Sequence, residues 1–140
     1  MTVEELAKVL EMQEEILQFS SFTNADAWEL GTMVVMEARR LGVSIAVRIR
    51  LNNGYTVFQY GMDGTNLYNE QWLTRKENTV RTLEQSSLRL YMSLRETQET
   101  LEERFLNPNE YAACGGGFPI RVEEVGVIGS IVVSGLDHVS

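Results

Sequence analysis

The hydrophobic pattern changes its period several times along the chain, and its first part predicts two helices. Apolar residues recur at helical spacing over residues 3–18, with glutamates on the opposite face. A second amphipathic helix is predicted to begin after Thr23 or Asn24, either of which can act as an N-cap, and to stop at Gly42. Gly31 lies within its apolar stripe, where glycine costs about 1 kcal/mol against alanine, so we expect another backbone to pass close by.

Four later segments have the pattern of strands. Residues 43–51 alternate apolar and polar side chains, which predicts a half-buried strand. Residues 52–54 are a hairpin turn signal, and the return strand follows over residues 56–62. In the last third, residues 118–123 and 126–134 also read as strands. The second of these is apolar on both faces, as a central strand would be.

The first strand carries two arginines, Arg48 and Arg50, on its polar face. Such a pair can form an anion site. More often it belongs to the solvated side of an antiparallel sheet, or to a contact between subunits. The sequence alone does not decide between these alternatives.

The segment NEQWLTRKENTV, residues 69–80, is a predicted helix whose polar residues fall at positions expected to be apolar. At helical spacing, Asn69 and Lys76 point into the middle of the apolar stripe, and Arg75 lies at its border. The stripe consists of Trp72, Leu73, Val80 and Leu83.

A lysine on a core-facing stripe is costly, because a buried ammonium group must find an anion or lose its proton. We therefore expect an acidic group opposite Lys76, either a protein carboxylate or a ligand. The alternatives are a structural ion pair and a lysine that extends past Trp72 into water.

Two serines, Ser86 and Ser87, are expected to bend or divide this helical region. A further helix is then predicted over residues 90–105, with the charges of RETQETLEER on a solvated face. Asn107 and Pro108 are expected to end that helix.

A run of three glycines, residues 115–117, precedes the third strand. Glycines can adopt backbone angles closed to other residues, and several of their N–H groups can point at one carboxylate or phosphate. The run is also compatible with a tight connection and nothing more. No lysine follows as in a P-loop, and no helix follows as in a dinucleotide-binding fingerprint.

Composition narrows the classes of function. The 140 residues suit one domain, and the net charge of −8 disfavours nucleic acid and anionic membranes as partners. The N-terminus lacks the pattern of a signal peptide, and no window of about 18 apolar residues exists, so we expect a cytoplasmic protein. The only cysteine, Cys114, has no second cysteine for a disulfide or a metal site, and we expect it to be buried.

Five blocks of the chain together resemble the haem-degrading-domain (GlcG/HbpS-like) family. They are FTNADAWELG at 22–31, DGT at 63–65, NEQWLTRKENTV at 69–80, GGGFPIRV at 115–122 and GVIGSIVVSGL at 126–136. The resemblance implies an α/β (α+β) fold, in which a mainly antiparallel sheet of about five strands is flanked by helices in a profilin-like layered sandwich. It also implies homo-oligomers. Relatives include haem-binding sensors, glycolate-operon proteins and the C-terminal domain of a corrinoid adenosyltransferase.

The sequence departs from the family pattern at two points. Haem iron needs a His, Cys, Met or Tyr ligand, and the only histidine, His138, is two residues from the end. The family usually continues into a C-terminal helix, whereas this chain stops at Ser140. We expect one domain over 1–140 in which that helix is missing, or in which a neighbouring subunit covers the same surface.

The leading hypothesis is a homo-oligomeric protein that binds a small anionic molecule, with haem as one possible ligand and no metal held by the protein. In this hypothesis Lys76 and Arg75 pair with the anion, and Asn69 orients it. Trp72 forms an apolar or cation-π wall, and the glycines donate N–H groups. The proposed ligand-binding residues are Asn69, Trp72, Arg75, Lys76, Gly115, Gly116 and Gly117. The alternatives are an adaptor oligomer that binds protein partners, and a weak haem-degrading enzyme.

Overall fold

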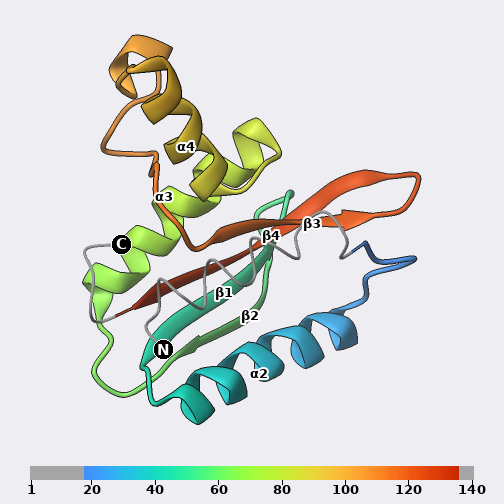
Figure 1. Cartoon of the computed structure of the whole chain (residues 1–140). Helices are drawn as coiled ribbons and strands as arrows, with labels where there is room; N and C mark the ends of the chain where they lie inside the picture. The colour runs from blue at the N-terminus through green and yellow to red at the C-terminus, as the bar shows by residue number, and fades with distance from the viewer. Residues whose placement is uncertain (1–17, 136–140) are drawn as a thin grey trace.

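A four-stranded antiparallel sheet forms the centre of the protein in the computed structural model, which describes residues 18–135. The strands are β1 (Ile45–Leu51), β2 (Thr56–Gly61), β3 (Gly117–Val122) and β4 (Gly126–Gly135), in the order β2-β1-β4-β3. Helix α2 covers one face of the sheet and helix α3 the other (Figure 1). The predicted α/β layered fold with an antiparallel sheet is thereby confirmed, and the predicted helix over 3–18 lies outside the described residues, apart from its last residue.

The sheet has four strands in the described part of the chain, where about five were expected. Phe19 takes the place next to β3: its N–H donates to the Arg121 carbonyl at 3.0 Å, and its carbonyl accepts from the Glu123 N–H at 2.8 Å. This pairing with Val122 is an isolated parallel bridge and not a strand.

Helix α2 (Asn24–Leu41) begins and ends where the sequence predicts. The Thr23 side chain accepts from the Asp26 N–H, and Asp26 returns the bond in a capping box. Gly42 closes the helix in the left-handed conformation, with φ of 72°. The expectation that another backbone passes close to Gly31 is wrong. The ring of the Phe58 side chain packs there instead, and it would lie 2.4 Å from a Cβ added to Gly31.

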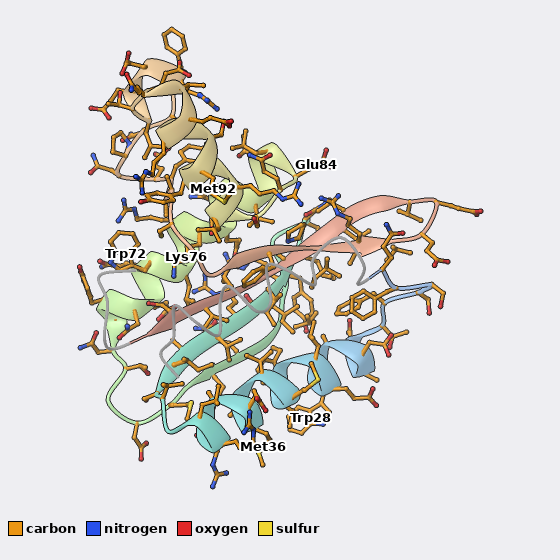
Figure 2. The ribbon with its side chains drawn as sticks, in the orientation of Figure 1. Trp28, Met36, Trp72, Lys76, Glu84 and Met92 are labelled. Carbon is orange, nitrogen blue, oxygen red and sulfur yellow. The ribbon has the colours of Figure 1, made fainter. Side chains whose placement is uncertain are left out.

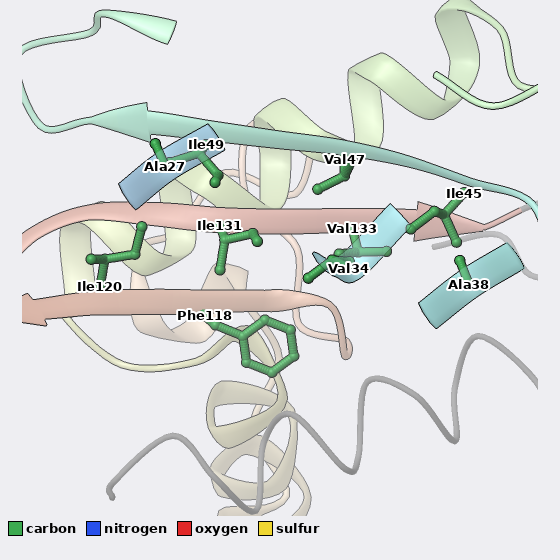
Figure 3. Close-up of a cluster of buried hydrophobic side chains, with 10 residues drawn as sticks. All are labelled: Ala27, Val34, Ala38, Ile45, Val47, Ile49, Phe118, Ile120, Ile131 and Val133. Carbon is green, nitrogen blue, oxygen red and sulfur yellow. The ribbon is translucent and has the colours of Figure 1, made fainter. Parts of the chain in front are cut away.

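The main hydrophobic core lies between α2 and the sheet (Figure 3). Each fully buried aliphatic or aromatic side chain in it contributes roughly 1.5–3 kcal/mol. Its buried members are Ala27, Val34, Ala38, Ile45, Val47, Ile49, Phe118, Ile120, Ile131 and Val133. This layer holds the sheet rigid, so the opposite face can present polar groups to α3.

Strands β1 and β4 are the two central strands, as their pairing with each other and with the edges shows. For β4 this confirms the prediction. For β1 the alternative of a solvated polar face is excluded, because Ala46 is buried and Arg48 is only 2% exposed. The physical reason is that α3 lies over this face of the sheet, which the strand's own alternation does not reveal.

Helix α3 (Leu67–Leu83) is separated from α4 (Ser87–Thr97) at the predicted serines, and Ser86 caps α4 by accepting from the Arg89 N–H. The prediction of a helix through residue 105 is wrong. Gln98 adopts a left-handed φ of 58° and ends α4, and only a short 3-10 helix, η1 (Glu102–Arg104), follows. Figure 1 shows α4 and this loop projecting away from the sheet.

Candidate functional site

The N-terminus of α3 is tied to the end of β4 through Asn69. Asn66 caps the helix by accepting from the Tyr68 N–H, and Asn69 completes a capping box by accepting from the Asn66 N–H. The Asn69 Nδ2 then donates to the Ser134 Oγ at 3.3 Å and to the Gly135 carbonyl at 3.1 Å. Asn69 is thus buried and faces the sheet, as its place on the predicted stripe required.

Lys76 is also buried against the sheet, with 1% of its surface exposed (Figure 2). Its Nζ donates to the Val133 carbonyl of β4 at 2.7 Å. Among residues 18–135 no carboxylate forms a salt bridge with it, so the expected protein carboxylate is not found there. A backbone carbonyl supplies the negative end of a dipole instead. Burial lowers the pKa of Lys76 to about 8, and the nearby Cys114 thiol, when ionised, opposes that shift.

The glycine run lets the backbone approach α3 closely. Gly116 has φ of 112°, and a Cβ there would lie 2.5 Å from the Val133 carbonyl oxygen and 2.7 Å from the Lys76 Nζ. The Gly117 N–H donates to the Ser87 Oγ at 2.9 Å, and the Gly116 carbonyl accepts from the Val133 N–H. These backbone groups therefore serve the packing of β4 and α3, while Gly115 is half-buried beside them.

Trp72 and Arg75 lie on the other side of α3, where they reach the surface. The Arg75 guanidinium carbon sits 3.9 Å from the Trp72 ring centroid, in cation-π geometry. Its Nη2 donates to the Pro108 carbonyl at 2.7 Å. Its Nε is buried and has no hydrogen-bond partner within the part of the chain that the structure describes.

A surface hollow of about 460 Å³ opens beside Arg75. We call it the Arg75 hollow. Six of its seven lining residues have polar or charged side chains, and the Asn78 Nδ2 on its wall donates to the Glu110 carbonyl at 2.8 Å. The hollow is lined by Gln71, Thr74, Arg75, Asn78, Pro108, Asn109 and Glu110. Of the seven predicted residues, only Arg75 lines it. Asn69, Lys76, Gly116 and Gly117 form a separate buried group around the end of β4, and ligand contact by all seven stays a prediction.

Sequence reasoning missed an ionic network between β1 and α3. The buried Arg48 contacts the Glu70 carboxylate at 3.2 Å and the Glu77 carboxylate at 3.5 Å, while Arg50 contacts Glu77 at 3.1 Å. The Arg48 Nε also donates to the Gln59 Oε1. The two arginines therefore meet carboxylates of their own chain. The helical spacing of Glu70 and Glu77, two turns apart, was the one available signal.

Residues 18–135 contain neither a cluster of metal ligands nor a membrane-spanning helix. No group of three or more His, Cys, Asp or Glu side chains in this part of the chain is placed to hold a metal ion. No helix among these residues combines the length and the apolar character needed to cross a membrane.

Comparison with known proteins adds family relationships to this geometry. Residues 22–140 match a family described as haem degrading protein HbpS-like. The UPF0303 protein YE1367 of Yersinia enterocolitica is 42% identical over 129 residues, which cover 91% of this chain and 76% of that protein.

Two solved structures share the fold. The structure of Ybr137w protein has a TM-score of 0.79 and 31% sequence identity. The similarity covers 93% of this chain and 77% of the Ybr137w chain. The structure described as a PduOC:Heme complex has a TM-score of 0.69, with 83% of each chain covered. At 19% identity the second likeness concerns the fold alone.

Proposed function

The chain belongs to the haem-degrading HbpS-like family, and from this premise we propose that it binds a small anionic molecule at the Arg75 hollow. We further propose that it does so as a cytoplasmic homo-oligomer. A carboxylated tetrapyrrole is the first ligand class to test, because the family is described by haem degradation and one structural neighbour is a haem complex.

The observation that carries this proposal is the state of the Arg75 guanidinium. The group is oriented on one side by the Trp72 ring and at one end by the Pro108 carbonyl, while its Nε has no partner among the described residues. A planar guanidinium held in a fixed orientation suits the two oxygens of a carboxylate or phosphate. The hollow beside it is within the size range of small-molecule sites, roughly 300–1,000 Å³.

The Arg75 hollow fits the carboxylates of haem better than its iron. Iron in haem takes a His, Cys, Met or Tyr ligand, and none of these residue types lines the hollow. The only histidine, His138, lies outside the described residues. The proposal therefore assigns to Arg75 the binding of an anionic group, and no step of haem chemistry.

The buried residues are proposed to hold α3 in place. Asn69 and Lys76 join α3 to β4, and Gly116 and Gly117 permit the close approach of that strand. They hold the helix on which Arg75 and Trp72 stand. Because the Asn69, Lys76 and Gly117 donors already have partners, we propose that this group positions the helix. We propose direct ligand contact for Arg75, with the Trp72 ring holding its guanidinium in place.

The first test is a haemin titration followed by visible absorption, on the native protein and on Arg75→Gln. The substitution removes the cation while keeping a side chain of similar reach. We expect saturable binding by the native protein and at least a tenfold weaker affinity for the variant, since a charge-assisted hydrogen bond contributes about 1.5–3 kcal/mol.

The matched control is Arg95→Gln, because Arg95 also lies over an aromatic ring, that of Tyr91 on α4. Its affinity should equal that of the native protein. Equal losses in both variants would contradict the assignment to Arg75. A featureless titration with haemin, and with a panel of smaller dicarboxylates, would reject anion binding and favour the adaptor hypothesis.

A further inference from the structure

The outer edge of β2 lacks a partner strand within residues 18–135, since β2 pairs with β1 alone. Its sequence, TVFQYG, contains no charged residue and no proline. Natural edge strands are usually protected by such residues, because open N–H and C=O groups pair readily with another strand. The β2 edge has neither of these protections and is therefore open to pairing with another strand.

A groove of about 1,000 Å³ runs beside this edge, between α2 and β2. We call it the α2–β2 groove. Its walls include Val35, Phe58 and Met62, together with two side chains that are unusually exposed for their size. These are Trp28, 63% exposed, and Tyr60, 49% exposed. Figure 2 shows Trp28 and Met36 on the same outer side of the molecule, along α2.

The edge and the groove together set the geometry of a partner. A strand added to β2 in antiparallel register from a second copy is related to the first by a two-fold axis perpendicular to the sheet. That axis leaves both α2 helices on the same face. Each α2 then lies beside the other copy's groove, and its exposed Trp28 can fill it.

Charge supports a second copy as the occupant. The chain carries a net charge of −8, so two copies approach best through a surface without acidic excess. The β2 edge is neutral, and the α2–β2 groove is lined by one cation and one anion, Arg39 and Asp63. A surface that holds both signs is complementary to itself under a two-fold axis.

We propose that two copies of this chain associate through antiparallel β2–β2 pairing, forming a continuous eight-stranded sheet with the two α2–β2 grooves closed by the α2 helices. The interface is isologous and buries Trp28 and Tyr60 of both copies. It deepens the homo-oligomer part of the proposed function by naming the surface. It does not depend on the Arg75 hollow, which lies on α3 across the sheet.

Cysteine cross-linking tests this interface directly. In a Cys114→Ser background, Gln59→Cys places one thiol near the middle of β2, where the proposed two-fold pairing brings it close to its symmetry mate. The control is Phe105→Cys in the same background, because Phe105 is 95% exposed and lies beyond α4, far along the chain from the edge. Under mild oxidation we expect Gln59→Cys to form covalent dimers at least tenfold faster than Phe105→Cys. Equal rates would overturn the proposal.

Light scattering gives a second, non-covalent measurement. Tyr60→Lys puts a charge on the open edge, while Tyr91→Lys makes the same change on the exposed surface of α4. We expect Tyr60→Lys to halve the molar mass and Tyr91→Lys to leave it unchanged. An unchanged mass for Tyr60→Lys would also overturn the interface, and would leave the groove to an apolar ligand or another protein.

The same samples separate this inference from the proposed ligand binding. Haemin titration of Tyr60→Lys should give the affinity of the native protein, since the substitution is remote from Arg75. A lost interface with intact binding, or intact assembly with no binding, identifies which of the two proposals has failed.

Discussion

Lys76 places its ammonium group in the layer between α3 and β4, where it donates to the Val133 carbonyl. Among the described residues no carboxylate forms a salt bridge with it. Its burial therefore destabilises the charged form, which is why its pKa falls to about 8 from 10.5. In the unfolded chain the same lysine keeps its ordinary pKa. Stability must then depend on pH, and the sign follows from which state binds more protons.

We predict that the native protein gains stability relative to Lys76→Met as the pH rises from 8 to about 10.5. Below pH 8 both states are protonated and the cost of burial is present in full. Between the two pKa values only the unfolded state holds the proton, so the cost is progressively lost. The whole change is roughly 3.5 kcal/mol, because each pH unit between the two pKa values contributes about 1.4 kcal/mol.

Urea denaturation of both proteins at several pH values measures this difference, because other titrating groups are common to both and cancel. A difference in unfolding free energy that stays constant from pH 7 to 10 would show that Lys76 is not buried as a charged group.

The hydropathy of residues 69–80 identified Lys76 and Asn69 as core-facing, and the structure confirms that both are buried. Their partners were beyond sequence reasoning, because Lys76 bonds the Val133 carbonyl and Asn69 the Gly135 carbonyl. Every residue has a carbonyl, so no side-chain pattern marks the one that will be used. The hollow beside Arg75 could not be predicted either, because it forms only where the loop at Pro108 folds back against α3.

At the scale of elements, the network of Arg48, Arg50, Glu70 and Glu77 joins β1 to α3. Its two carboxylates differ sharply in environment. The Glu77 side chain is 4% exposed and serves both arginines, whereas the Glu70 side chain is 48% exposed and contacts one. Position in the network, and not the chemistry of the residue, should decide the effect of removing either charge.

We predict that Glu77→Gln lowers the free energy of unfolding by about 3 kcal/mol, because it leaves Arg50 without a carboxylate partner among the described residues and Arg48 with the half-exposed Glu70 alone. Glu70→Gln is the matched control and should cost less than about 1 kcal/mol, since solvent already screens the Glu70 carboxylate and Arg48 keeps the buried Glu77. Thermal or urea denaturation of the two variants gives the comparison. Equal losses would contradict the division into a buried and an exposed partner.

Element boundaries were predictable where local capping sets them, and not where tertiary contacts do. Thr23 and Gly42 bound α2 as expected, because both act on their own helix. The helix expected to reach residue 105 stops at Thr97. There Arg104 folds back to donate to the Thr97 and Ser93 hydroxyls, contacts that a continuous helix would not allow. The charged residues of this segment suit a solvated helix and a solvated loop equally, so they could not show where the helix ends.

At the scale of the whole molecule, the sheet separates two surfaces with different proposed tasks. Helix α3 lies on one face and α2 on the other (Figure 1). The Arg75 hollow is lined partly by residues of α3, and the α2–β2 groove partly by residues of α2. The two hairpins were readable from the chain, but the β1–β4 pairing that joins them is not local in sequence. Because β1 pairs with β4 on one side and with β2 on the other, β2 is left at the edge of the sheet. The proposed β2–β2 interface could therefore not be predicted from the sequence.

We propose that the Arg75 guanidinium binds the anionic group of a small molecule, and nuclear magnetic resonance of the guanidinium tests this most directly. The Nε–Hε signal of Arg75 is followed in isotope-labelled protein during titration with a porphyrin dicarboxylate. We predict a saturable shift of this signal, while the signal of Arg95 stays in place. An unmoved Arg75 signal, or equal shifts at both arginines, would contradict it.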